Sequence, residues 1–351
     1  MGHAIEMSVK DRILADIQAS GPMPFDRFME IALYDPAGFF GGRQLRSEKG
    51  GDFLTSPEVS PLFGETLGVY VERERQRIGE PFRLIEVGAG SGSLLAALLE
   101  RVEVESWAVE VSQAAREALT AVVPENQILP DLPDRVRGVI LANELLDNLP
   151  MALVQKMDGR WRERWVGAVG ESLHFVDADP RVEVHDWLER HAGDVPDGGW
   201  VEVQLPAQAW LKDALRRLEA GSVLIIDYGD TAENLLPRRR DGTLRTYRAH
   251  HLGPHPLDEP GATDITADVN FTALIATAEA AGASVELHRQ DDFLAELGLR
   301  ERLSELRHAE LEAARSGDEM ERLGLRSLKT EAETLLHPRG LGDFRVLVAE
   351  V

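Results

Sequence analysis

The sequence predicts an α/β fold built on a Rossmann-like, doubly wound parallel sheet, and three observations support this. From residue 83 onward, short apolar strands alternate with helical segments. A glycine-rich turn, 88–92, separates the first of these strands from an apolar helix. The apolar run 222–229 is typical of a fully buried strand and contains Asp227 near its end. Strands that alternate with helices favour a parallel sheet with helices on both faces.

The elements are expected in four stretches. Residues 1–80 form an N-terminal helical segment, with helices over 8–20, from Pro24 and over 58–78, and a loop over 51–57. Residues 81–230 hold core strands near 83–87, 106–112, within 136–150, at 200–204 and at 222–229, with an inserted β-meander over 152–200. Residues 231–343 hold an insert loop or lid up to 264, a helix at 271–281, a strand at 284–290 and a charged helical cap over 291–336. The run 344–351 is the final core strand, and the last two strands form an antiparallel end of the sheet.

Composition narrows the functional classes. The 351 residues suggest roughly two domains and carry a net charge of −23, which argues against a nucleic-acid partner and an anionic membrane surface. The charge permits a cationic substrate and is equally explained by solubility or adaptation to salt. Cysteine is absent, which excludes disulfides and thiolate catalysis, and no histidine or acid spacing indicates a metal site. No apolar run reaches the roughly 18 residues of a membrane span, and no signal core is visible, so a cytoplasmic location is expected.

The glycine-rich turn carries the chemistry. A dinucleotide fingerprint would need a third glycine at position 93, which is Ser93. The spacing here is Gly88, Gly90 and Gly92, with Glu86 two residues before the first glycine. That arrangement is typical of S-adenosylmethionine-binding methyltransferases, in which Glu86 would face a cofactor bearing an ammonium. A turn that only packs a helix on a sheet is the alternative.

Two further acids follow the next strands. Glu110 ends the second strand, 22 residues after Gly88, where an acid can accept both ribose hydroxyls of NAD or of S-adenosylmethionine. Asp131 follows a weak third strand and could meet the adenine amino group, but it could equally be a surface turn residue. Both are therefore expected to bind the cofactor.

Polar residues also follow the apolar strand that ends near residue 142. Asn143, Glu144 and Asp147 come directly after it. The carboxyl ends of parallel strands form the ligand crevice, so these residues are expected where a methyl acceptor meets the cofactor. The alternative for Asp147 is a cap of the following turn.

Together, several blocks resemble one family, the MidA-type methyltransferases, which includes a mitochondrial complex I assembly factor that methylates a protein arginine. The matching blocks are 28–36, 51–58, 63–65, 86–92, 109–112, 142–150, 226–229, 242–250 and 264–271. The resemblance runs from about residue 10 to the end and implies a class I methyltransferase fold with S-adenosyl-L-methionine as cofactor. Two departures are Phe39-Phe40 in place of two tyrosines, and Ala89 and Ser91 in place of Pro and Arg.

The resemblance also assigns roles in the segments around the core. It implies that the loop 51–58 folds over the cofactor, with Asp52, Thr55 and Ser56 as polar contacts. It places His250 and Asp264 toward the same cleft, although His250 alone would suggest an exposed loop histidine. The run 238–240, three arginines, is expected to be solvated or to contact an acidic partner.

An arginine acceptor sets a specific chemical demand. Guanidinium stays protonated in water, so a site needs carboxylates that clamp it and leave one nitrogen facing the methyl group. Glu144, with Asp147 as a second acid, could form this clamp. His250 could accept the released proton, because its ordinary pKa is about 6.5.

The leading hypothesis is therefore protein arginine N-methylation of a protein or peptide partner. A small-molecule O- or N-methyltransferase is the first alternative, and a non-catalytic assembly factor that binds the cofactor is the second. A nicotinamide oxidoreductase is disfavoured by Ser93 and Glu86. The acceptor, the degree and symmetry of methylation, a homodimer and a required partner stay open.

Overall fold

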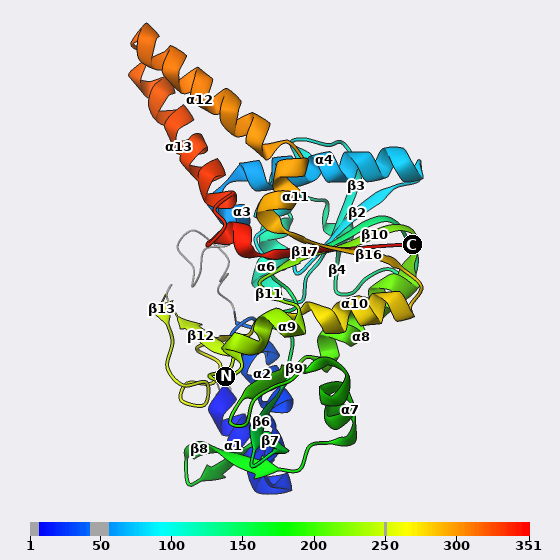
Figure 1. The fold of residues 1–351 in the computed structure, drawn as a ribbon, viewed down its shortest axis with the longest axis vertical. Helices are drawn as coiled ribbons and strands as arrows, with labels where there is room; N and C mark the ends of the chain where they lie inside the picture. The colour runs from blue at the N-terminus through cyan, green and yellow to red at the C-terminus, as the bar shows by residue number, and fades with distance from the viewer. Residues whose placement is uncertain (1–6, 43–55, 249–250) are drawn as a thin grey trace, which may run out of the picture.

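A seven-stranded sheet forms the centre of the computed structural model, which describes residues 7–42, 56–248 and 251–351 (Figure 1). The strand order is β16-β17-β10-β5-β2-β3-β4. These strands are β2 (Arg83–Val87), β3 (Glu105–Val109), β4 (Ile128–Leu129), β5 (Val136–Asn143), β10 (Leu218–Asp227), β16 (Ser284–Arg289) and β17 (Arg345–Glu350). The five strands from β4 to β10 run parallel, and β17 is antiparallel to both of its neighbours. The predicted doubly wound sheet and its antiparallel end are confirmed.

Helices cover both faces of this sheet, which explains why its central strands are apolar almost throughout. Within β5, Val139 and Leu141 pack on one face, and Ile140 and Ala142 pack on the other. The first face carries α4 (Pro61–Ile78), α5 (Ser93–Leu99) and α6 (Gln113–Leu119), and the second carries α8 (Leu205–Arg217) and α10 (Phe271–Ala280). Figure 1 shows α4 and α10 on opposite sides of the sheet.

The predicted β-meander forms a second sheet at one end of the molecule. It contains β6 (Ala152–Met157), β7 (Arg160–Val169), β8 (Ser172–Ala178), β9 (Trp200–Val203) and the short β1 (Met23–Pro24), with α7 (Val182–His191) packed against it. The placement of residues 200–204 in the central sheet was wrong. β9 pairs antiparallel with β6, because Val201 and Val203 bury their side chains with Val154 and Trp187 in a separate core.

The N-terminal segment packs on two different sheets. α1 (Val9–Ser20) and α2 (Phe25–Tyr34) share a core with the meander, whereas α4 lies on the central sheet. The expected helix over 58–78 is interrupted, because α3 (Ser56–Val59) ends before Ser60. The Ser60 hydroxyl accepts a hydrogen bond from the Leu62 amide at 3.2 Å and so caps the start of α4.

The segment expected as an insert loop contains regular structure of its own. It holds β11 (Gly229–Asp230), α9 (Ala232–Leu235), β12 (Arg245–Arg248), β13 (His251–Leu252), β14 (Asp264–Thr266) and, just after it, β15 (Val269–Asn270). Strands β13, β12 and β14 form a small antiparallel sheet. Short 3₁₀ turns lie at Glu125–Gln127, Leu236–Arg238 and Leu341–Asp343. The expectation of a solvated run at 238–240 is wrong for Arg239, which is buried and donates to Glu202 Oε2 at 2.5 Å.

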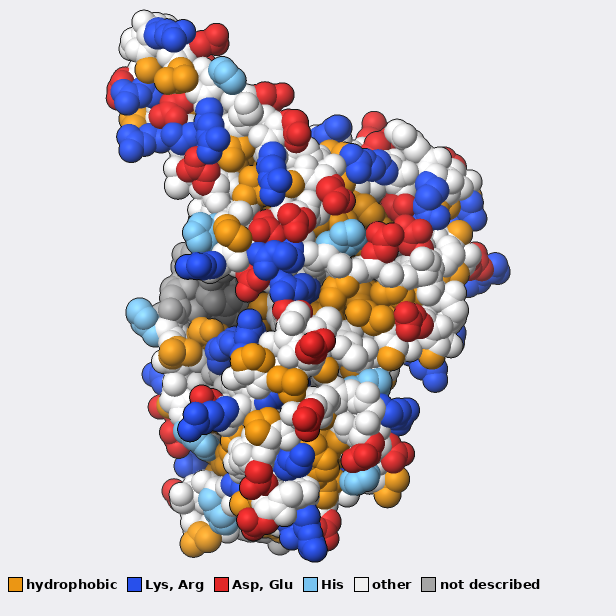
Figure 2. Space-filling view, in the orientation of Figure 1, with side chains coloured by type: hydrophobic (Ala, Val, Ile, Leu, Met, Phe, Trp, Pro, Cys, Tyr) orange, Lys and Arg blue, Asp and Glu red, His pale blue; other side chains and the backbone are white. Residues whose placement is uncertain are grey.

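Three helices near the C-terminus confirm the helical character expected for 291–336: α11 (Gln290–Glu296), α12 (Leu299–Ser316) and α13 (Glu319–Leu335). The last two form a hairpin that extends away from the body in Figure 1. Figure 2 shows side chains of both charges along it, with hydrophobic side chains near its tip, where Leu311, Met320 and Leu323 are exposed. Within the described ranges, none of the helices has the length and apolar character needed to cross a bilayer.

Candidate functional site

The glycine-rich turn lies between β2 and α5, at the carboxyl edge of the parallel strands. Gly88, Gly90 and Gly92 have φ angles of 70°, 52° and 80°, which residues with a side chain rarely adopt. A Cβ atom added at Gly88 would lie 3.0 Å from Cδ1 of Leu145. The turn therefore packs closely against the segment that follows β5.

Glu110, directly after β3, holds the other side of this turn. Its Oε2 accepts a hydrogen bond from the Gly90 amide at 2.9 Å, and its Oε1 accepts one from the Ser112 amide at 2.8 Å. A carboxylate offers about four lone-pair positions, so Glu110 can accept further hydrogen bonds. This arrangement is compatible with the expected contact to ribose hydroxyls.

Glu86 is buried within β2, and 4% of its surface is exposed. Its Oε2 has no hydrogen-bond partner among the described residues. Burial, and then the nearby charge of Glu110, raise the pKa of Glu86 to about 8. A cation bound beside it would relieve both penalties, which fits the ammonium of the expected cofactor.

The segment after β5 has an unusual backbone. Glu144 has a φ of 49°, although it is not glycine, and its amide donates to the carbonyl oxygen of Ile226 at 2.8 Å. Backbone conformations of this kind cluster at functional sites. The Asn143 side chain donates from Nδ2 to Glu144 Oε1 at 3.3 Å, while its Oδ1 is buried without a partner among the residues that the structure describes.

Asp227, the last residue of β10, fixes the backbone of that segment. Its Oδ2 accepts hydrogen bonds from the amides of Leu146 at 3.0 Å and Asp147 at 3.3 Å. Burial raises the pKa of Asp227 well above its ordinary value, and the charges of Asp147 and Glu144 raise it further. The acids at the ends of β5 and β10 thus lie close enough to repel one another.

Asp147 points inward rather than toward solvent, with 3% of its surface exposed. Its Oδ2 accepts hydrogen bonds from the hydroxyls of Tyr228 and Thr266, the second at 2.6 Å. Its Oδ1 is buried and has no partner within the described part of the chain. Burial raises the pKa of Asp147, whereas the hydrogen bonds from Thr266 and Tyr228 lower it.

Tyr34, in the N-terminal segment, lies near Glu110 and the acids Asp147 and Asp264. The Tyr34 hydroxyl, at the end of α2, donates to the Asn148 carbonyl oxygen at 3.1 Å. The Asn148 side chain donates in turn to Asp264 Oδ1 at 2.8 Å. Burial, and then the charges of Asp147, Asp264 and Glu110, raise the pKa of Tyr34. The structure therefore brings Glu110 and Asp147 into one site, beside Asp264.

The other predicted site residues have separate outcomes. Ser56 is buried, and its hydroxyl accepts a 3.4 Å hydrogen bond from Gln290 Nε2, on the side of the C-terminal helices. The Asp131 side chain is 71% exposed and forms a 3.1 Å ion pair with Arg217, so its adenine contact stays a prediction. Asp52, Thr55 and His250 lie outside the described residues.

Sequence reasoning missed several residues of this site. Asp227 was visible as the acid that ends an apolar strand, but no role followed from that position. Tyr34 and Thr266 carry no local signal, because they lie 114 and 119 residues from their hydrogen-bond partners Asn148 and Asp147. Tyr228 follows Asp227 directly, and only the turn of the chain after β10 directs its hydroxyl to Asp147.

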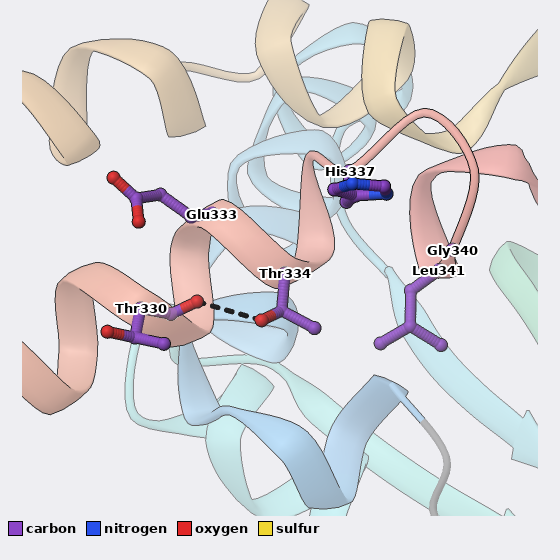
Figure 3. Close-up of a pocket in the computed structure, with 6 residues that line it drawn as sticks. All are labelled: Thr330, Glu333, Thr334, His337, Gly340 and Leu341. Atoms are coloured by element: carbon purple, nitrogen blue, oxygen red, sulfur yellow. Dashed lines mark hydrogen bonds between the residues drawn. The ribbon is translucent and has the colours of Figure 1, made fainter.

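A separate cavity of about 540 Å³ lies at the end of α13 (Figure 3). Its lining comprises Thr330, Glu333, Thr334, His337, Gly340 and Leu341. None of the predicted site residues is among them. Glu144 and Asp147, which were expected to act on the methyl acceptor, follow β5 at the carboxyl edge of the strands instead.

Unpaired buried atoms show what the strand edge would bind. Among the described residues, the buried side-chain oxygens without a hydrogen-bond partner belong to Glu86, Asn143, Asp147 and Gln290. All four residues lie near the carboxyl ends of β2, β5 or β16. Buried acceptors without donors are unfavourable, so this edge favours a ligand that brings N–H donors or positive charge. The ammonium of S-adenosylmethionine is such a group.

Comparison with known proteins agrees with this geometry. The model of a family of S-adenosyl-L-methionine-dependent methyltransferases matches residues 66–288. The mitochondrial protein arginine methyltransferase NDUFAF7 homolog of Drosophila melanogaster is 30% identical over 317 residues, which cover 78% of this chain and 71% of the relative. The human mitochondrial protein arginine methyltransferase NDUFAF7 is 29% identical over 341 residues, 84% of this chain and 74% of the relative.

The fold has a close match of known structure. A protein from Burkholderia thailandensis, solved bound to S-adenosyl-homocysteine, superposes with a TM-score of 0.86 at 30% identity, over 98% of this chain and 92% of that one. The class I methyltransferase fold and the cofactor that the sequence implied are confirmed. The chain belongs to this family of S-adenosyl-L-methionine-dependent methyltransferases.

Proposed function

We propose that this methyltransferase methylates an arginine side chain of a protein or peptide. The observation that carries the proposal is the concentration of acids at the edge of the strands, where Glu144, Asp147, Asp227 and Asp264 lie together. The charges of Asp147 and Glu144 raise the pKa of Asp227, and the charge of Asp264 also raises the pKa of Tyr228. A guanidinium is a permanent cation with five N–H donors, and it matches such a set of acceptors better than a neutral or anionic acceptor would.

Two further observations support this choice. The relatives from Drosophila and human are named as protein arginine methyltransferases. The chain carries a net charge of −23, which favours association with a basic partner. The partner is thus proposed to be a basic protein or peptide, with the helices of 291–336 acting as a cap over it.

The site residues have separate proposed roles. Bound S-adenosylmethionine supplies the electrophilic methyl group. The turn 88–92, Glu86 and Glu110 would hold that cofactor. Glu144 and Asp147 would orient the guanidinium so that one nitrogen faces the methyl group. The role of His250 as proton acceptor and the cytoplasmic location stay predictions.

The test is transfer of label from methyl-labelled S-adenosylmethionine to lysate proteins, to small molecules, and to matched peptide arrays with arginine or lysine at the variable position. We expect label in proteins and in arginine peptides only. Glu144→Gln should lower the transfer rate at least tenfold while S-adenosyl-homocysteine binding stays intact, because the clamp loses a charge. Glu105→Gln, at the opposite end of β3, is the matched control. Label confined to small molecules or to lysine peptides would contradict the proposal.

A further inference from the structure

We propose that Tyr228 and Thr266 are positioning residues, which fix Asp147 so that its Oδ1 atom is offered to an N–H group at the methyl-transfer position. This inference rests on the proposed function, because it takes the acceptor atom to be a nitrogen that carries hydrogen. It adds two residues from outside the segment 143–147 to the site. Neither residue was expected from the sequence.

The contacts come from three separate parts of the chain. Asp147 follows β5, Tyr228 follows β10, and Thr266 ends β14 in the insert. Both hydroxyls donate to the same oxygen, Oδ2 of Asp147, and the two hydroxyls also contact each other. The Tyr228 ring packs edge-on against Phe344, with ring centroids 5.5 Å apart, which limits its movement. Rotation of the Asp147 carboxylate would break both hydrogen bonds, so its orientation is fixed.

Because Oδ2 of Asp147 is held by the two hydroxyls, its Oδ1 is the oxygen that can accept a hydrogen bond from a ligand. That oxygen is buried and has no hydrogen-bond partner within the described part of the chain. Asn143 is the last residue of β5, four residues before Asp147. Its Oδ1 is also buried and has no hydrogen-bond partner among the described residues. A buried acceptor gains most from a ligand that supplies a hydrogen. The pair therefore favours an N–H donor over a carboxylate or phosphate.

The surrounding charges reinforce this preference. The titratable groups whose charges or hydrogen bonds act around Asp147 are Tyr34, Glu144, Asp227, Tyr228 and Asp264. Arg245 is a basic side chain whose charge reaches Tyr228, and it is paired with Asp268 at 3.1 Å. The acids around Asp147 therefore keep a surplus of negative charge for a cationic ligand. Hydrogen bonds from Thr266 and Tyr228 lower the pKa of Asp147 against the effect of burial. They therefore favour the ionised form, which accepts rather than donates.

The test uses two analogues of the cofactor, and it needs no methyl acceptor. Sinefungin carries a primary amine where S-adenosylmethionine carries the methyl group on sulfur, whereas S-adenosyl-homocysteine carries nothing there. The affinities of both are measured by titration calorimetry for the wild-type chain, Tyr228→Phe, Thr266→Val and Asp147→Asn. Tyr70→Phe is the matched control, because its buried hydroxyl donates to Ser222 at 2.7 Å, in the middle of β10 and five residues before Asp227.

We expect the wild-type chain to bind sinefungin more tightly than S-adenosyl-homocysteine. In each of the three site variants the ratio of the S-adenosyl-homocysteine Kd to the sinefungin Kd should fall about tenfold, as expected for the loss of a hydrogen bond to a charged group. S-adenosyl-homocysteine should bind the site variants as it binds the wild type, and Tyr70→Phe should keep the full preference. A purely structural role would weaken both analogues equally or leave the preference unchanged, and either result would overturn the inference. So would a wild-type chain that binds both analogues alike. Failure of arginine peptides to be methylated would instead count against the proposed function, because the preference for sinefungin is measured without them.

Discussion

The carboxylate of Glu110 accepts a hydrogen bond from the backbone amide of Gly90 at 2.9 Å and one from Ser112 at 2.8 Å. These bonds join the end of β3 to the glycine-rich turn after β2, at the edge where parallel strands present their ligands. The same residue was expected to bind the cofactor ribose. Glu110 therefore helps to hold the backbone of the turn 88–92 in place.

Replacement of Glu110 should weaken cofactor binding. Hydrogen bonds to a charged group are worth about 1.5–3 kcal/mol each, so loss of one that orders the turn should raise the Kd of S-adenosyl-homocysteine about tenfold to a hundredfold in Glu110→Ala. Titration calorimetry measures this directly. Glu105→Ala, at the exposed start of the same strand, should bind as the wild type does. Equal affinity in Glu110→Ala and the wild type would contradict the role.

Glu86 should make stability depend on pH. Burial raises its pKa to about 8 in the folded chain, from an ordinary value of 4.5, so the folded state binds more protons than the unfolded state between these values. The free energy of unfolding contributed by Glu86 therefore falls as pH rises from about 5 to 8. Glu86→Gln should flatten this slope in urea unfolding, and cofactor binding to the wild type near pH 7 should release protons that the variant does not release. An unchanged slope would show that Glu86 is not the titrating group.

Gly92 should tolerate a side chain less well than Gly159. Both have φ angles near 75°, namely 80° and 72°. A Cβ at Gly92 would lie 2.8 Å from Leu119 Cδ2, whereas a Cβ at Gly159 would meet nothing within 4 Å. Backbone strain costs about 1 kcal/mol at either position, and overpacking at Gly92 adds about 1–3 kcal/mol. Urea unfolding of Gly92→Ala and Gly159→Ala measures the difference, and equal losses would contradict it.

The buried ion pair of Arg239 and Glu202 should be essential to the insert. Their side chains are 1% and 0% exposed, and Glu202 also accepts the Thr243 amide at 2.7 Å. Arg239→Met leaves a buried carboxylate without its cation and should cost about 3–5 kcal/mol of the free energy of unfolding. The double variant Arg239→Met with Glu202→Gln should be less destabilised than Arg239→Met alone, as judged by urea unfolding. Additive losses would show that the two residues are not coupled.

Local pattern was sufficient for most of the central sheet. The apolar strand, the turn at 88–92 and the following helix were predicted because apolar runs and glycine spacing mark each of them along the chain. The misassignment of β9 has the opposite origin. Its apolar sequence fits either sheet, and only its pairing with β6 and its contacts with Trp187 place it in the meander.

The acids of the site show the same division. Glu86, Glu110 and Asp147 could be named from the sequence, because each stands at or just after a predicted strand. The pKa values and orientations of these side chains could not be predicted from the sequence. The raised pKa of Glu86 depends on burial and on Glu110, and the inward direction of Asp147 depends on hydroxyls 81 and 119 residues away.

The sequence by itself determined the fold class, the cofactor and the edge of the sheet where the chemistry belongs. These follow from hydrophobic periodicity, from the spacing of the glycines, from acids at strand ends and from the family resemblance, all of which can be read along the chain. Only the tertiary structure decided that Tyr34, Tyr228 and Thr266 belong to the site, that Asp131 pairs with Arg217 at the surface, and that Arg239 is buried. Burial and hydrogen bonding depend on which segments pack together in the folded chain. Segments that are far apart in the sequence cannot be paired from local patterns.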